Sequence, residues 1–337
     1  MGSRRSPEES PRAAEMPPAA PTLAGGKRYH AHGVGLCAVD YLCRVERLPV
    51  VGEKLQVSAI SRRPGGQVGT ALTALSRWGL RTVYSGKFGD DAEGEFGRAE
   101  LAAAGVELAG AITVAGAPSQ SAIILVHAGS GERTILWQRA PEVILRPQEL
   151  QPQLTESAQA LILDGYEVDA AIEAARTARR GGAIVMLDAE EVAGTPRVAE
   201  LVSLCDVVIG CADFPQRFTG LRERRAALRR LHASLPRGGL AGCTLGPDGA
   251  LLFDGERFFS SPGFAVTAVD TTGAGDVFHA GFLYATLVMP ERGLGFRLDF
   301  ANACAALSCT ALGAREGIPR LEEALRLVAE RTEAKYC

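Results

Sequence analysis

Short apolar runs alternate with segments of helical periodicity over most of the chain, beginning near Tyr29. Four of these runs have the length of buried strands, and they cover residues 160–163, 184–187, 207–209 and 241–245. In the helical segments apolar residues recur every three or four positions, as where Val68, Leu72 and Leu75 share one face. Strands that are apolar on both faces and alternate with helices predict a parallel sheet covered by helices on both sides.

Two stretches interrupt this alternation, residues 42–63 and residues 119–137. Both have extended patterns, and in the second stretch two apolar runs flank the turn at residues 129–131. Such an arrangement is typical of a β-hairpin. We therefore expect the two stretches to form a small sheet beside the main one.

The carboxyl ends of the expected strands carry polar or small residues. These residues are Asp164, Asp188, Gly210, Thr244 and Gly246. Open parallel sheets bind their ligands at the carboxyl ends of the strands. The sequence therefore predicts a ligand site along this edge, under the small sheet.

The composition excludes several classes of protein. The 337 residues are 47% hydrophobic and 22% charged, which is enough apolar chain to bury a substantial core. The formal net charge of -3 predicts no nucleic-acid partner, because nonselective binding of nucleic acid needs a positive field. No apolar run approaches the roughly 20 residues that span a bilayer, and no signal-peptide pattern is present. We expect a cytoplasmic protein with no membrane partner.

The two ends of the chain differ from its body. Residues 1–28 are rich in Pro, Ala, Ser, Arg and Glu, a composition that predicts a disordered tail. We expect one domain over residues 29–330 and a short C-terminal tail at residues 331–337. The eight cysteines include no Cys-x-x-Cys pair, so we expect reduced thiols in place of a disulfide or zinc framework.

The strongest chemical signal is the turn Gly273-Ala274-Gly275, which is followed by Asp276 and an apolar helix. Small residues in a turn that opens a helix leave backbone N–H groups uncovered, and the helix dipole reinforces them as an anion cradle. A phosphate group fits such a cradle, and Asp276 can accept a proton from a hydroxyl that attacks the phosphate. The alternative, an Asp that only caps the helix, stays open at this point.

Other glycine-rich stretches are weaker signals. Gly66 leads into an amphipathic helix in which Gln67 and Thr70 offer hydrogen bonds to a hydroxyl-rich ligand, although a turn that needs positive φ is the alternative. Gly33 and Gly35 nominally match the dinucleotide-binding fingerprint, but no clear amphipathic helix follows them. This argues against a Rossmann oxidoreductase, and no glycine-lysine pair continues as a P-loop does.

Taken together, these blocks resemble the ribokinase (PfkB-type) family of carbohydrate kinases. The order and spacing of the blocks carry the resemblance, and they lie at residues 65–66, 89–94, 243–249 and 270–276. The segments that look most like the ketohexokinase and sulfofructose kinase branch are residues 119–122, 131–135 and 313–319. The resemblance implies an α/β fold with three α/β/α layers around a mostly parallel sheet, and a small β-sheet that acts as a lid.

The resemblance also implies roles for individual residues. The catalytic base would be Asp276, and the amides of Gly273, Ala274 and Gly275 would stabilise the transferred phosphoryl group. Sugar hydroxyls would be held by Asp40, Gly66 and Thr70, with Gln67 and Asp164 as further candidates. The ATP site would be lined by Thr244, Gly246, Gly249 and His279. Family members bind K⁺ at the positions of Asp270, Thr272, Ser308 and Gly313.

The chain departs from the family pattern at three places. Thr70 and Ala38 stand where the sugar-binding signature and the first strand often have Asn, which points away from ribose as the substrate. The Asn-x-x-Glu motif that usually organises Mg²⁺ is replaced by residues 211–214, Cys-Ala-Asp-Phe. Asp188 and Glu190 are the candidate substitutes for Mg²⁺.

The expected function is ATP- and Mg²⁺-dependent phosphorylation of a primary hydroxyl on a ketose-like sugar or sugar derivative. In relatives the small sheet often pairs between subunits, so the resemblance also implies a homodimer. A nucleoside kinase is one alternative, and its aromatic stacking surface would come chiefly from Trp137 and Phe214. A noncatalytic regulator that binds nucleotide or sugar on the same fold is another, although this chain keeps Asp276 and the glycines around it.

Overall fold

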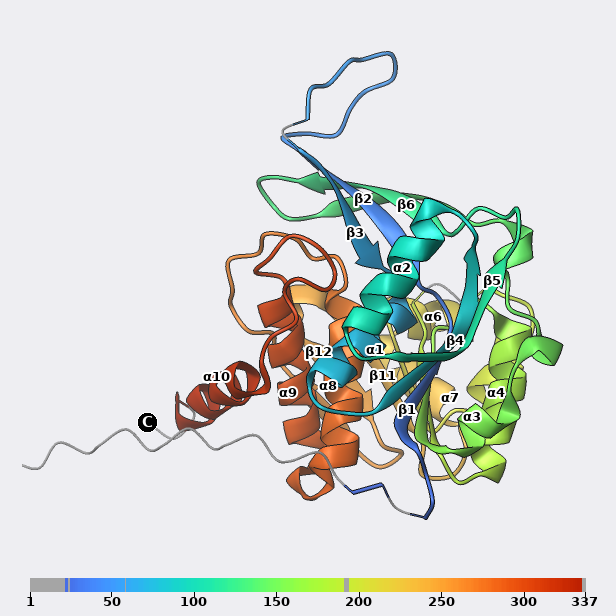
Figure 1. The fold of residues 1–337 in the computed structure, drawn as a ribbon. Coiled ribbons are helices and arrows are strands. Elements are labelled where there is room, and N and C mark those ends of the chain that lie inside the picture. Colours follow the sequence, from blue (N-terminus) through green and yellow to red (C-terminus); the bar gives the residue numbers. More distant parts are fainter. Residues whose placement is uncertain (1–21, 24, 58, 191–193, 335–337) are drawn as a thin grey trace, which may run out of the picture.

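A nine-stranded sheet lies at the centre of the computed structural model, which describes residues 22–23, 25–57, 59–190 and 194–334 (Figure 1). Its spatial order is β13-β12-β11-β10-β9-β8-β1-β4-β5. The strands are β1 (Tyr29–Val34), β4 (Thr82–Gly89), β5 (Glu107–Val114), β8 (Ala158–Leu163), β9 (Ile184–Asp188), β10 (Val207–Gly210), β11 (Leu240–Thr244), β12 (Ala250–Phe253) and β13 (Phe258–Ser261). Neighbours from β11 to β5 pair in parallel, whereas β12 runs antiparallel to β11 and β13. The four strands predicted from apolar runs are β8 to β11, and the mostly parallel sheet is confirmed.

Helices cover both faces of this sheet. The helices of one face are α1 (Gln67–Arg77), α8 (Ala274–Val288), α9 (Gly293–Ser308) and α10 (Leu321–Ala334), and those of the other are α4 (Val168–Arg180), α5 (Val198–Val202), α6 (Phe214–Thr219) and α7 (Arg224–His232). Two more helices, α2 (Ala92–Ala103) and α3 (Pro152–Glu156), pack near β4 and β8. Short 3-10 turns lie at Pro141–Val143, Pro147–Glu149, Gly246–Asp248 and Pro290–Arg292. The layers are therefore α/β/α, as predicted.

Each face of the sheet has its own hydrophobic core. Along β8, Ala160 and Ile162 pack into the core under α1 and α8, while Leu161 and Leu163 pack into the core under α4. Successive side chains of a strand point to opposite faces, so a continuous apolar run serves both cores. This is the physical reason why the buried strands read as unbroken apolar runs in the sequence.

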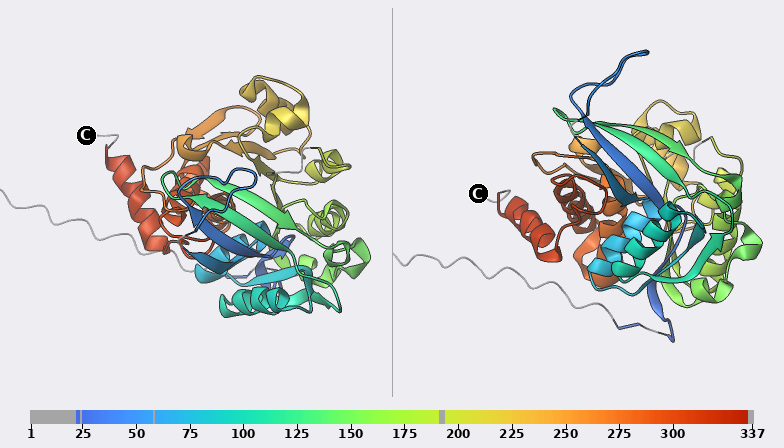
Figure 2. Two further views of the ribbon diagram at one scale, coloured as in Figure 1. Left: turned by 90° about the horizontal axis from the view of Figure 1, so that it is seen from above. Right: turned by 45° about the horizontal axis from the view of Figure 1, so that its top comes forward.

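A second sheet of four strands has the order β3-β2-β6-β7. Its strands are β2 (Ala38–Val45), β3 (Ile60–Gly65), β6 (Ser121–His127) and β7 (Arg133–Gln138). The predicted hairpin is confirmed, because β6 and β7 pair antiparallel with Ile123 opposite Leu136. In the first predicted stretch only the ends are strands, and residues 46–59 connect them. Since β2 follows β1 after the short turn 35–37, this sheet lies at the carboxyl end of the main one (Figures 1 and 2).

Described residues on both sides of the predicted domain, 29–330, also contact the body or continue its elements. The Lys27 ammonium donates to the carbonyl oxygens of Glu156 and Gly181 at 2.7 and 2.9 Å. At the other end α10 continues to Ala334, beyond residue 330. The predicted N-terminal tail falls almost wholly outside the described residues. Within those residues, no helix combines the length and the apolar character that crossing a membrane requires.

Candidate active site

The predicted anion cradle is a left-handed turn at the start of α8. Gly273 caps the helix with φ of 78°, and a Cβ added to it would lie 2.7 Å from Cβ of Ala314. Only glycine adopts this conformation without strain, and only glycine fits against Ala314. The backbone therefore requires glycine here for two independent reasons.

The amides of this turn are largely free. Within the described ranges, neither Gly273 N nor Gly275 N has an acceptor, whereas Ala274 N donates to the Thr271 carbonyl at a long 3.3 Å. A Cβ added to Gly275 would meet nothing within 4 Å, so the space in front of the turn is open. Uncovered N–H groups at a helix N-terminus form an anion site, and the predicted cradle has this geometry.

Asp276 lies in the first turn of α8, where it is 9% exposed. In the part of the chain that the structure describes, its carboxyl group accepts no hydrogen bond. Burial, and then the negative charges of Asp188 and Glu190, raise the pKa of Asp276 well above its usual range, while Arg133 lowers it. A carboxylate with a raised pKa and no partner is suited to take a proton from a bound hydroxyl.

Asp188, at the end of β9, connects the cradle to the centre of the sheet. Its Oδ2 lies 3.3 Å from Nδ1 of His279, which is also 2.7 Å from the Gly275 carbonyl oxygen. The other ring nitrogen, Nε2, is 3.0 Å from the carbonyl oxygen of Ile209. His279 is thus buried behind the cradle between α8 and β10, and burial lowers its pKa. From this position His279 holds the turn at Gly273–Gly275 against β10.

The candidate Mg²⁺ ligands are two neighbouring carboxylates, Asp188 and Glu190. Burial is the main cause that raises the pKa of Asp188, and the nearby negative charge of Glu190 raises it further. Glu190 also accepts a hydrogen bond of 3.0 Å from Gln67. Among the described residues no three Asp, Glu, His or Cys side chains form a metal-binding group. Mg²⁺ in kinases is commonly held by one or two carboxylates together with nucleotide phosphates. These two carboxylates fit that arrangement.

The predicted sugar platform is the junction between β3 and α1. Gly66 has φ of 85°, and a Cβ there would lie 2.7 Å from Cα of Cys37. Asp40 on β2 packs against Gly65, where a Cβ would be 2.0 Å from its Oδ2. Burial raises the pKa of Asp40 to about 7, although the charge of Arg315 lowers it. The structure thus brings Asp40 and Gly66 together, as predicted.

Gln67 and Asp164, the further sugar candidates, have protein partners. Gln67 donates to Glu190 through Nε2, while its Oε1 is buried without a partner. The Asp164 carboxylate accepts from the amide of Leu36 at 2.5 Å and from that of Tyr166 at 3.1 Å, and burial raises its pKa to about 6. In this structure Asp164 therefore holds the turn between β1 and β2.

Arg315 is a site residue to which the sequence reasoning gave no role. It is 1% exposed, donates to the Gly65 carbonyl at 2.7 Å and contacts the hydroxyl of Thr70 at 3.4 Å. Its Nη1 is buried and has no hydrogen-bond partner among the residues that the structure describes. A buried cation with an unused donor beside Asp40 stabilises the ionised carboxylate and offers a further donor to a polar ligand. In sequence, residues 313–319 show only a resemblance to one branch of the family, because the burial of an arginine cannot be seen there.

The residues predicted for the ATP site follow β11. Thr244 is half-buried and its hydroxyl donates to the Gly210 carbonyl at 3.4 Å. Gly246 has φ of 59° and faces open space, whereas Gly249 has φ of 96° and no room for a Cβ, which would lie 2.0 Å from the Ser261 carbonyl oxygen. Gly246 therefore leaves room for a ligand. At Gly249 the backbone of the loop packs directly against the backbone of Ser261.

The predicted K⁺ residues are partly brought together. The carboxylate of Asp270 is fully buried and accepts from the amide and hydroxyl of Thr272 at 2.9 and 2.7 Å, and from the amide of Gly313 at 2.9 Å. The Ser308 hydroxyl donates to Ala305, and the Ser308 carbonyl packs against Gly317. Asp270 thus joins the loop before the cradle to the loop after α9.

The small sheet contacts the cradle directly. On β7, Nη1 of Arg133 donates to the Thr271 hydroxyl at 3.0 Å, and this hydroxyl donates to the Gly131 carbonyl at 3.1 Å. The hairpin β6–β7 therefore lies over the anion site. Sequence reasoning predicted the hairpin but not this contact, because it depends on the packing of two distant segments.

Of the two aromatic candidates for nucleoside stacking, one is unavailable. Phe214 is fully buried and stacks on Phe218 inside the core, whereas Trp137 is 61% exposed on the small sheet. Of the two candidates, Trp137 is therefore the one whose ring is accessible to a nucleoside.

Comparisons with known proteins cover nearly the whole described chain. The sequence pattern of pfkB family carbohydrate kinases matches residues 32–321. The ATP-dependent ribose-1-phosphate kinase of Halopiger xanaduensis is 28% identical over 295 residues, 87% of this chain and 95% of that protein. Fructokinase-2 of Solanum lycopersicum is 30% identical over 294 residues, 79% of this chain and 87% of that protein. The structure of Arabidopsis thaliana ribokinase complexed with ribose and ATP is 25% identical with a TM-score of 0.74, covering 89% of this chain and 98% of that one.

Proposed function

Because the chain belongs to the pfkB family of carbohydrate kinases, and is therefore an ATP-dependent sugar kinase, we propose that it phosphorylates a primary hydroxyl of a ketose-like sugar or sugar derivative with Asp276 as the base. One observation carries the proposal. The carboxyl group of Asp276, which accepts no hydrogen bond from the described residues, lies in the same helical turn as the amides of Gly273 and Gly275, which donate to none of them. A proton acceptor and an anion cradle within one turn are what in-line phosphoryl transfer needs.

The proposed step moves one proton and one phosphoryl group. Asp276 takes the proton of the sugar hydroxyl, and the sugar oxygen attacks the γ-phosphorus of ATP. The bond between this phosphorus and the β–γ bridging oxygen breaks, so that ADP leaves with the electron pair. The amides of Gly273, Ala274 and Gly275 donate to the oxygens of the phosphoryl group in transit, a contribution typically worth about 100-fold or more in turnover.

Support for nucleotide and cation sites comes from the residues around the cradle. We assign Thr244, Gly246 and Gly249 to ATP. Asp188 and Glu190 would hold Mg²⁺, which neutralises phosphate charge when bound. Asp270, Thr272, Ser308 and Gly313 would form a K⁺ site, for which the buried Asp270 carboxylate is the charged member.

The sugar class is supported by Asp40, Gly66 and Thr70. Asp40 and Arg315 present an acceptor and a donor beside Gly65, a combination that suits neighbouring hydroxyl groups. The named activities of the relatives, on fructose and on ribose 1-phosphate, make ketohexoses and phosphorylated pentoses the first compounds to assay.

We also propose that the small sheet is a lid and a dimer interface in a cytoplasmic enzyme. Most of the exposed large apolar side chains lie on this sheet or its loops: Leu48, Val50, Val51, Ile60, Ile123, Ile135, Leu136 and Trp137. Ile123 and Leu136 are opposite each other in the pair of β6 and β7, so they are exposed together on one face of the sheet, and exposed apolar side chains of this kind mark an interaction surface. A lid over the cradle would exclude water and limit ATP hydrolysis.

The test is turnover of purified protein with ATP, Mg²⁺ and a panel of ketoses, sugar phosphates, sulfosugars, sugar acids and nucleosides. Asp276→Asn should lower kcat on the best substrate by a factor of about 100 or more, whereas Asp169→Asn, a 57% exposed carboxylate, should not. Full turnover by Asp276→Asn would refute the base. Tight ADP binding with no turnover on any acceptor would favour a noncatalytic regulator, and a preference for nucleosides would favour a nucleoside kinase.

A further inference from the structure

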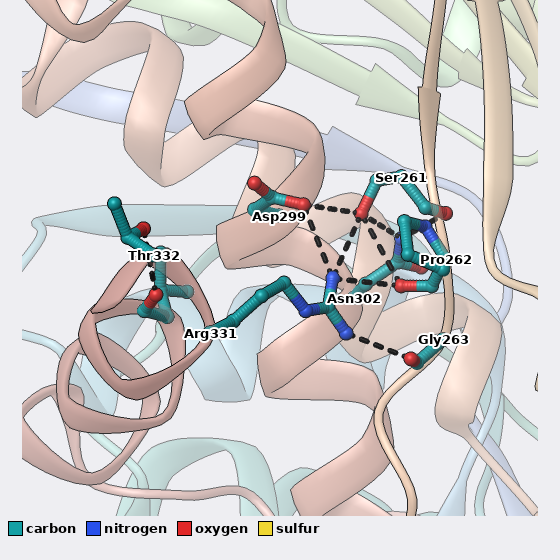
Figure 3. Close-up of polar contacts among 8 residues, drawn as sticks. Ser261, Pro262, Gly263, Asp299, Asn302, Arg331 and Thr332 are labelled. Atoms are coloured by element: carbon teal, nitrogen blue, oxygen red, sulfur yellow. Dashed lines mark hydrogen bonds and ion pairs between the residues drawn. The ribbon is translucent and has the colours of Figure 1, made fainter. Parts of the chain in front are cut away.

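Arg331, near the end of α10, lies against the loop that follows β13 (Figure 3). Its Nη1 donates to the Pro262 carbonyl at 2.8 Å and its Nη2 donates to the Gly263 carbonyl at 2.7 Å. The guanidinium is 3.1 Å from Oδ1 of Asp299 and packs on the ring of Phe264. Only 13% of the Arg331 side chain is exposed. This is a bidentate, charge-assisted contact with consecutive backbone carbonyls.

Two residues of α9 complete the contact with the same loop. Asp299 accepts a hydrogen bond of 2.6 Å from the Ser261 hydroxyl. Asn302 donates to the Ser261 hydroxyl at 2.7 Å and to the Ser261 carbonyl at 3.1 Å. The carbonyls of residues 261, 262 and 263 are therefore all held by side chains of α9 and α10, as Figure 3 shows. We call residues 261–263 the clamped loop.

The clamped loop touches the predicted nucleotide loop backbone to backbone. A Cβ on Gly249 would lie 2.0 Å from the Ser261 carbonyl oxygen and 2.6 Å from Gly263 N, and a Cβ on Gly263 would lie 2.1 Å from the Pro247 carbonyl oxygen. No side chain separates the two loops, so a shift of one displaces the other. The position of Gly246–Asp248 thus depends on the clamped loop.

We propose that Arg331 is a positioning residue for the nucleotide: it fixes the clamped loop and, through it, the loop that receives ATP. The inference rests on the proposed assignment of Gly246 and Gly249 to ATP. The sugar platform at Gly65-Gly66 is built by β2, β3 and α1, whereas the hydrogen bonds, ion pair and ring contact of Arg331 among the described residues are with residues 261–264 and Asp299. Loss of Arg331 therefore acts on the nucleotide and spares the sugar. A role that only anchors α10 would instead lower stability without this selectivity.

The experiment compares Arg331→Met with Arg326→Met, an exposed arginine on the same helix. The first readout is the Kd of ADP by calorimetry, which requires no turnover. The second is the KM for ATP, the KM for the best sugar and kcat. We expect Arg331→Met to raise the Kd of ADP and the KM for ATP about tenfold, with sugar KM and kcat within about twofold of the wild type. Arg326→Met should change none of them.

Asp299→Asn is the second variant, because it keeps the Oδ1 acceptor for Ser261 and weakens only the ion pair with Arg331. It should raise the Kd of ADP less than Arg331→Met does, and it keeps the test available if that variant does not fold. Unchanged ADP affinity in a folded Arg331→Met protein overturns the inference, as does an equal loss of sugar affinity. If the wild type binds ADP but phosphorylates no sugar, the proposed function fails while the ADP comparison still decides the role of Arg331.

Discussion

Replacing Asp40 with asparagine should stabilise the protein at alkaline pH while it weakens the binding of the sugar. Asp40 is 6% exposed, and its environment opposes the ionised form that we assign to sugar binding. Burial is the main cause, Arg315 partly offsets it, and the negative charges of Asp270 and Glu316 add to it. Together they raise the pKa of Asp40 from an ordinary 3.8 to about 7.

The size of the effect follows from proton linkage. A carboxyl whose pKa is raised on folding holds its proton more tightly in the folded state than in the unfolded state. The free energy of unfolding is therefore highest below the unfolded pKa, and it falls as pH rises from the unfolded pKa to the folded pKa. Each pKa unit corresponds to about 1.4 kcal/mol, so ionisation of Asp40 lowers the free energy of unfolding by up to about 4 kcal/mol at about pH 8. Asparagine resembles the protonated acid in shape and charge, and Asp40→Asn escapes this loss.

Urea unfolding of the wild type and Asp40→Asn at about pH 8 and about pH 4 measures the effect. We expect the variant to be more stable at the higher pH, and the difference to shrink toward the lower pH, where both side chains are neutral. Asp248→Asn, an exposed carboxylate, is the matched control and should show neither change. Equal stability of Asp40→Asn and wild type at about pH 8, or a gain that does not depend on pH, would refute the reasoning.

Four further predictions concern the cradle, the sugar platform and the small sheet. Gly273→Ala must place a Cβ against Ala314 at positive φ, so kcat should fall about 100-fold in steady-state assays; an unaltered kcat would contradict the anion-hole role. Arg133→Met removes a positive charge that lowers the pKa of Asp276, so the acid limb of the kcat profile should move to higher pH, and an unmoved limb would exclude this interaction. Arg315→Met should raise the sugar KM at least about tenfold without changing the ATP KM, and equal changes in both would point to general misfolding. If the protein forms the proposed dimer, Leu136→Glu should convert it to monomer in sedimentation, and a variant that stays dimeric would exclude this face as the interface.

Much of the fold could be predicted because its elements leave periodic signals. The apolar runs that became β8 to β11 face two cores, and the hairpin of β6 and β7 is marked by its glycine turn. The contacts at the ends of the chain could not be predicted in this way. Lys27 and Arg331 are charged residues in the segments that we predict to be tails, and both are held by backbone carbonyls of distant elements. A hydrogen bond from a side chain to the backbone carbonyl of a distant segment leaves no local pattern in the sequence.

The same contrast separates the predicted from the unpredicted parts of the site. The turn at Gly273 could be recognised because positive φ and free amides demand glycine before a helix. Asp164 and His279, which we predict at the ligand, also bind backbone groups, namely the Leu36 amide and the carbonyls of Gly275 and Ile209. Sequence shows that a polar residue ends a strand or begins a helix, and it does not show which backbone group reaches that residue first.

The loop after α9 gives a physical reason why the cradle and the proposed sugar platform keep a fixed separation. Gly313 donates to Asp270 ahead of the cradle, Ala314 fills the space under Gly273, and Arg315 holds the carbonyl of Gly65 at the sugar platform. Three consecutive residues therefore set the cradle and the platform relative to one another. Phosphoryl transfer depends on the reacting oxygen and phosphorus being held within a few tenths of an ångström of the productive geometry. A substitution in this loop would accordingly lower kcat even where it leaves the affinity for each substrate intact.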